Sequence, residues 1–146
     1  MMTGTHPSEV VRVVCALLSP FIGMFGLYVI IHGHYGPGGG FAGGVFVAVA
    51  AILPRLTLPE RLSYELVPPQ VGLVAGGIGM LLFLVVGTLP MLAGGAFLDY
   101  AAVDVPGMSD ARVRYYGILV VEIGVGMAVF GAMLMIFDTL TGRGSR

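Results

Sequence analysis

The sequence predicts an all-α integral membrane protein with four transmembrane helices. Of its 146 residues, 57% are hydrophobic and only 10% are charged, whereas about a quarter of the residues of a typical soluble domain are charged. The mean hydropathy is +0.97. Four apolar runs approach the length of about 20 residues that a helix needs to cross a bilayer. We expect the whole chain, residues 1–146, to form one membrane domain.

The four expected transmembrane spans cover residues 10–31, 38–53, 71–92 and 116–137. The second span is the shortest, and its first third is rich in glycine. Pro68 and Pro69 stand just before the third span, where proline favours the start of a helix. Between the second and third spans, the sequence LPERLSYEL is typical of a short helix at the membrane surface.

The distribution of arginine predicts that both termini are cytoplasmic. The chain has no lysine, and its seven basic residues are all arginine. With the termini inside, the cytoplasmic side would hold five of them, namely Arg12, Arg55, Arg61, Arg143 and Arg146. The outer side would hold only Arg112 and Arg114. Cytoplasmic loops usually carry the excess of positive charge, so the opposite orientation is disfavoured.

Composition also excludes several classes of function. The formal net charge of −1 gives no indication of nucleic-acid binding. The single cysteine, Cys15, cannot form a disulfide within the chain, nor a cysteine-based zinc site. His32 and His34 are two positions apart and do not share a helix face, which disfavours a paired metal site. We therefore expect no cofactor, no resident metal and no catalytic residues.

The stretch HGHYGPGGGFAGG, residues 32–44, lies between the first two spans. Within it, Gly38, Gly40 and Gly43 match the spacing G-x-G-x-x-G of dinucleotide-binding loops. That motif requires a preceding strand and an acidic residue about 20 positions later within a βαβ unit. Here an apolar run of membrane length precedes the glycines, and no lysine follows as a phosphate-binding loop requires. The sequence context rejects nucleotide binding.

Two interpretations of the glycine stretch remain open, and they are compatible. In the first, Pro37 ends one helix and opens the next. The pairs Gly39/Gly43 and Gly40/Gly44 then form smooth faces on which helices pack closely, while Phe41 interrupts the groove on another face. In the second, irregular backbone lines a polar cavity at membrane depth. The composition favours the packing interpretation.

Glu122 is the one ionisable residue deep inside an apolar run. An acid in such a position is by default a candidate for a substrate or proton path, because burying its charge is costly. The alternative is a hydrogen-bonded carboxyl group that fixes packing against a partner subunit. His34 is a second candidate, since histidine exchanges protons near neutral pH. Asp138, at the end of the same run, is expected to be an interfacial residue beside Arg143.

The sequences GHYGPGGGFAGG and YYGILVVEIGVG resemble the MrpB or MnhB component of the multisubunit Mrp-type Na+/H+ antiporters. In that family a glycine-rich signature joins the first two spans. The matching positions are Gly33, His34, Pro37, Gly38, Gly39, Gly40, Phe41, Gly43 and Gly44. The resemblance covers the whole chain, with four spans in a similar order.

The resemblance implies a multi-pass subunit of a hetero-oligomeric complex in the bacterial cytoplasmic membrane. The complex would exchange Na+ or another monovalent cation for H+, with membrane lipid and the other antiporter subunits as partners. The subunit would contribute to assembly and to the cation path, with Glu122 and His34 as candidates. Two alternatives remain open: the equivalent subunit of a redox-driven ion pump, such as a membrane-bound hydrogenase or a relative of complex I, and a purely structural spacer.

Overall fold

The computed structural model describes residues 8–33, 35–36 and 38–142, and all regular structure in this part of the chain is helical. The elements are α1 (Glu9–His32), α2 (Gly39–Thr57), α3 (Glu60–Leu66), α4 (Gln70–Leu92), the 3-10 turn η1 (Tyr100–Ala102) and α5 (Asp110–Leu140). Four helical segments, the third of which joins α3 to α4, are long and apolar enough to cross a membrane. The predicted all-α membrane fold with four spans is confirmed.

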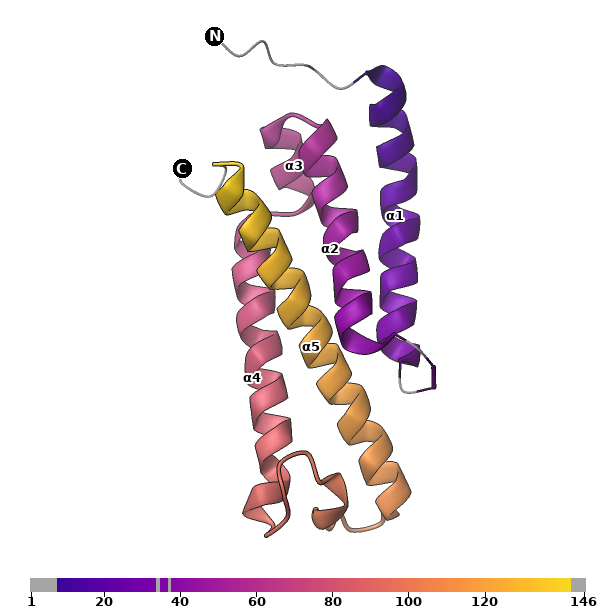
Figure 1. Ribbon diagram of the computed structural model, residues 1–146, viewed down its shortest axis with the longest axis vertical. Coiled ribbons are helices and arrows are strands. Elements are labelled where there is room, and N and C mark those ends of the chain that lie inside the picture. The colour runs from indigo at the N-terminus through magenta and orange to yellow at the C-terminus, as the bar shows by residue number, and fades with distance from the viewer. Residues whose placement is uncertain (1–7, 34, 37, 143–146) are drawn as a thin grey trace.

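The long helices form an open row in the order α1, α2, α5, α4 (Figure 1). Helices α2 and α5 occupy the centre and pack against each other, while α1 covers α2 and α4 covers α5. Within the described residues α1 and α4 make no contact. The start of α1, the end of α5 and the short helix α3 lie at one end of the molecule, which we call the α3 end (Figure 1). The segment 93–109 closes the opposite end, which we call the loop end.

The helix bounds differ from the expected spans mainly at the end of α2 and at both ends of α5. The sequence suggested that the second span stops before Pro54, but α2 continues through Pro54 to Thr57. A proline inside a helix removes one N–H donor and crowds the carbonyl group four residues earlier, yet Pro54 lies inside α2. The following residue, Arg55, is completely buried. Helix α5 extends from Asp110 to Leu140, well beyond the apolar run on both sides. The sequence LPERLSYEL does contain a short helix, α3.

The interior of the row is made of small residues. The only buried hydrophobic side chains among the described residues are Ile30, Ala48, Ala51 and Leu134. Large apolar side chains on all four long helices are exposed. In water this distribution would be unstable, but lipid is as apolar as these side chains and does not drive them inward. Membrane helices associate through close van der Waals packing instead, and small residues permit it.

Glycines determine how closely the helices approach. A Cβ atom added to Gly79 on α4 would lie 2.5 Å from the backbone of Gly124 and Ala128 on α5. One added to Gly43 on α2 would lie 2.6 Å from the carbonyl oxygen of Gly26 on α1. These distances are too short for any real side chain. Of the predicted pair Gly39/Gly43, Gly43 therefore packs on α1, whereas Gly39 meets only the Glu122 side chain. Ser19 on α1 adds a hydrogen bond of 2.6 Å to the carbonyl oxygen of Ala50 on α2.

We predict that Gly79→Ala destabilises the protein, because its methyl group would collide with the backbone of α5. Overpacking of this kind typically costs about 1–3 kcal/mol. The matched control is Gly77→Ala, two positions away on α4, where an added Cβ meets nothing within 4 Å. The thermal midpoint of the purified complex should fall for Gly79→Ala and stay unchanged for Gly77→Ala. Equal midpoints for the two variants would contradict the close α4–α5 packing.

Candidate ion site at the glycine turn

The carboxyl group of Glu122 lies against the turn that connects α1 to α2. A Cβ atom added to Gly33, at the end of α1, would lie 2.5 Å from Glu122 Oε2. One added to Gly39, at the start of α2, would lie 3.3 Å from Glu122 Oε1. The Oε2 atom is buried. Glycine at both positions thus leaves the space that the carboxyl group fills, and Glu122 lies against the glycine signature.

The backbone of the turn requires glycine for a second reason. Gly38 and Gly39 have φ angles of +146° and +80°, a region that residues with a Cβ rarely adopt. Gly38 is the N-cap of α2 and has no side chain to bind the first N–H groups of the helix. These N–H groups have no partner within a helix and give its N-terminus a partial positive charge. The Glu122 carboxyl group therefore lies beside the partially positive start of α2.

Further along α2, the signature glycines provide contact faces on two sides. An added Cβ on Gly40 would collide with the backbone carbonyl of Glu122, and one on Gly44 would lie 2.6 Å from the carbonyl oxygen of Gly126. Both residues face α5, whereas Gly43 faces α1. Phe41 lies on another side and is 66% exposed. The packing interpretation therefore describes the helical part of the signature, and Gly33, Gly38 and Gly39 form the turn.

The two histidines differ in what the structure describes. His34 and Pro37 lie outside the described residues. The His32 ring is stacked on Tyr28, with centroids 4.2 Å apart, and its Nδ1 atom lies 3.1 Å from the Tyr28 carbonyl oxygen. His32 is exposed. A cavity of about 270 Å³ lies beside the turn, and it is lined by Tyr28, Val29, His32, Gly33, Tyr35 and Gly36. Gly33 borders both this cavity and the Glu122 carboxyl group.

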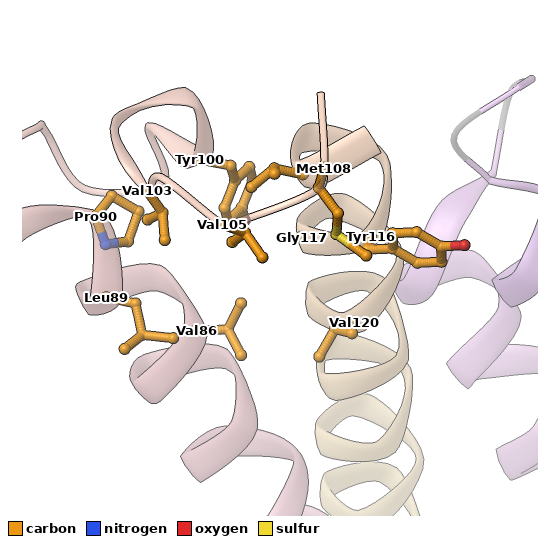
Figure 2. A pocket seen from close by; sticks show the side chains of 11 residues that line it. Val86, Leu89, Pro90, Tyr100, Val103, Val105, Met108, Tyr116, Gly117 and Val120 are labelled. Carbon is orange, nitrogen blue, oxygen red and sulfur yellow. The ribbon is translucent and has the colours of Figure 1, made fainter. Parts of the chain in front are cut away.

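A second cavity, of about 240 Å³, lies at the loop end between α4, α5 and the segment 93–109 (Figure 2). The side chains of Val86, Val103 and Val120 are among those around it, and Tyr100 and Tyr116 are the only residues in its wall with polar side-chain atoms. Burial raises the pKa of Tyr100 above its ordinary value. The cavity offers no charged ligand for a cation.

The sequence interpretation missed one buried cluster at the α3 end. Asp138 was expected at the interface beside Arg143, which lies outside the described residues. Asp138 instead accepts two hydrogen bonds from Arg55 on α2, of 2.7 Å from Nε and 3.0 Å from Nη2. Arg55 was counted only as a surface charge on the cytoplasmic side, yet it is fully buried. The one signal in the sequence was that each residue ends an apolar run.

No group of three or more His, Cys, Asp or Glu side chains within the described residues could hold a metal ion. A hard monovalent cation at the turn would therefore be bound by carboxylate and backbone carbonyl oxygens. The last carbonyl groups of a helix have no partner within it, and α1 ends at His32, beside Gly33. The carboxyl group thus lies between the carbonyl end of α1 and the N–H end of α2.

Comparison with known proteins agrees with this architecture. A family model described as a domain related to the MnhB subunit of Na+/H+ antiporter matches residues 10–135. The B-type component of the Na+/H+ antiporter of Bacillus subtilis is 28% identical over 128 residues, which are 85% of this chain and 86% of that protein. A Staphylococcus aureus protein named as the putative antiporter component mnhB2 is 29% identical over 133 residues, or 91% and 94% of the two chains. This four-helix membrane protein belongs to the MnhB family of Na+/H+ antiporter subunits.

Proposed function

We propose that this subunit supplies a carboxylate to the cation and proton path of a multisubunit Na+/H+ antiporter, and that Glu122 is this carboxylate. The observation that carries the proposal is the position of its carboxyl group between the ends of α1 and α2. Helix ends at membrane depth are a recurrent way to bind ions, because they present backbone groups without a helical partner. The function is transport, and no step of it converts a substrate chemically.

The depth of Glu122 supports this role. It lies five residues inside the apolar run that begins at Gly117, which corresponds to about 7 Å at 1.5 Å per residue. A carboxyl group at this depth is shielded from bulk water but lies near the membrane surface. Gly33 lines the cavity beside the turn and also lies against the carboxyl group, and we propose this cavity as the route of access. An exchangeable site needs both properties, since the ion must be held and then released.

The proposed exchange at Glu122 alternates between a proton and a cation. The carboxylate binds Na+ together with carbonyl oxygens from the end of α1, and protonation of the carboxylate releases the cation. The partial positive charge at the start of α2 favours the ionised carboxylate and so opposes permanent protonation. His34, which belongs to the glycine signature, is proposed to pass protons between water and Glu122, since histidine as a residue type exchanges protons near neutral pH.

We propose that the α3 end faces the cytoplasm and that the glycine turn faces the outer side. The beginning of α1 and the end of α5 lie at the same end of the molecule (Figure 1), so the two termini are expected on one side. Arg12, Arg55 and Arg61 belong to this end, whereas Arg112 and Arg114 belong to the loop end. The excess of arginine indicates the cytoplasmic side.

The two alternative functions make different demands on the molecule. A structural spacer requires the close packing of Gly40 and Gly44 against α5 but not an acid at position 122. A redox-driven pump would need partner subunits that hold redox cofactors. The names of the two relatives favour the antiporter. Mass spectrometry of the purified complex decides between antiporter and redox pump, because nickel–iron or iron–sulfur subunits would be found only in the latter.

We predict that Glu122→Gln lowers sodium-dependent proton exchange at least tenfold in inverted vesicles, because the amide neither ionises nor binds a proton. The complex should still assemble on a native gel, since glutamine has almost the same shape. Glu122→Asp should give an intermediate rate, because it keeps the carboxylate but shortens the side chain. The matched control is Glu65→Gln on the exposed helix α3. Full exchange by an assembled Glu122→Gln complex would refute the proposal and support the spacer.

We predict that Gly40→Ala reduces the amount of assembled complex, because the added methyl group would collide with the backbone of Glu122. The matched control is Gly36→Ala in the same glycine stretch, where an added Cβ meets nothing within 4 Å. Quantitative native gels should show a severalfold loss for Gly40→Ala and wild-type amounts for Gly36→Ala. Normal assembly of the Gly40→Ala complex would mean that α2 and α5 are not in backbone contact at Glu122.

A further inference from the structure

Arg55, a buried charge at the α3 end, lies far from the glycine turn and has no part in the proposed exchange. Its guanidinium group is fully buried, and the Asp138 side chain is 7% exposed. Both carboxylate oxygens of Asp138 accept hydrogen bonds from it. Arg55 Nη1 also donates to the Val67 carbonyl oxygen at 3.0 Å, and the Tyr64 ring centroid lies 5.2 Å from the guanidinium carbon. Arg55 therefore joins α2 to α5 and to the connection between α3 and α4.

This ion pair is the last contact in a regular series along α2 and α5, which run in the same direction (Figure 1). Gly40 packs on Glu122, and Gly44 packs on Gly126. Arg55 then binds Asp138, 83 positions later in the sequence. Each glycine contact joins residues 82 positions apart (122 − 40 and 126 − 44), which equals the separation of Arg55 and Asp138 to within one position. The two helices thus keep one register from the glycine turn to the α3 end.

Glycine contacts alone specify this register weakly. A helix surface repeats after about one turn, or 5.4 Å along its axis, and small apolar residues recur on α2 at Gly40, Gly44 and Ala48. A slip of one turn that brought Gly44 against Glu122 and Ala48 against Gly126 would again place small residues of α2 against α5. A forked guanidinium–carboxylate pair, by contrast, has one favourable geometry. Buried polar pairs are known to select helix register for this reason.

We propose that the Arg55–Asp138 ion pair is a register lock, which fixes α2 against α5 along their common direction and so positions the Glu122 carboxyl group at the first turn of α2. Glu122 and Asp138 lie about 24 Å apart on α5 at 1.5 Å per residue, so the pair acts on Glu122 only through the two helices. A one-turn slip would move Glu122 away from Gly39 and open the candidate ion site. The expected effect on exchange rests on the proposed function, whereas the register itself does not.

The test measures the register directly in the assembled complex. Spin labels are attached to cysteines at Leu56 on α2 and Ile118 on α5, both exposed, in a Cys15→Ala background. Their helical positions lie about 30 Å apart along the axis, which is suited to pulsed electron paramagnetic resonance. A control complex that carries Cys15→Ala and no introduced cysteine is treated with the same label. Any signal from it comes from cysteines of the other subunits. The labelled parent should give a single distance and should exchange ions.

Three variants are compared with this parent. Arg55→Met/Asp138→Leu replaces both charges by apolar side chains, a change that buried pairs often tolerate in stability. Arg55→Lys keeps the charge but loses the forked geometry. The distance is measured in this variant if the double variant does not assemble. Arg61→Met/Glu65→Gln is the matched control, because it removes an exposed ion pair within α3, and such pairs contribute little.

The register lock predicts that the double variant assembles with a broadened distance distribution, or with a second distance displaced by about 5 Å, and that exchange falls severalfold. Arg55→Lys should show the same broadening to a smaller extent, and the control should match the parent. An unchanged distribution in an assembled double variant, or in Arg55→Lys, overturns the lock. A displaced distribution with unchanged exchange would keep the lock but overturn its role in positioning Glu122, and would thereby count against the proposed function as well.

Discussion

The structure depends on the contact between the backbones of α2 and α5. Gly40 lies so close to Glu122 that no side chain could stand between them. Because no side chains separate the two backbones, the start of α2 lies directly against Glu122 on α5. Helix α1 then covers the remaining side of α2, and α4 covers the remaining side of α5. The backbone contact between α2 and α5 therefore accounts both for the row of helices and for the position of the Glu122 carboxyl group.

Asp138 and Glu122, the two acids in the apolar part of α5, have different surroundings. Asp138 is bound by both arms of the Arg55 guanidinium group. An ion pair of this kind is strongly destabilised when one partner is removed, which suits a permanent structural link. The Glu122 carboxyl group instead lies between the ends of α1 and α2, near partial charges of the backbone.

Much of the fold could be predicted from the sequence, because four apolar runs and the glycine stretch report on local structure. The partners of individual residues could not. Arg55 and Asp138 are 83 positions apart, and neither residue contains information about the other. Pro54 suggested the end of a helix, but α2 continues to Thr57 and includes the buried Arg55. The proximity of Glu122 to Gly39 likewise depends on helix register, which hydropathy does not specify.

The distribution of polar side chains limits what this chain can contribute to an ion path. The buried polar side chains within the described residues, Arg55, Thr57, Ser63 and Asp138, all belong to the α3 end. From Ile123 to Phe137 on α5 every residue is apolar or glycine, a distance of about 21 Å. Ions in a membrane need polar groups along their whole route. With Glu122 in its proposed role, this chain provides one ion-binding position of the path. The partner subunits that contact its exposed helix faces provide the other positions.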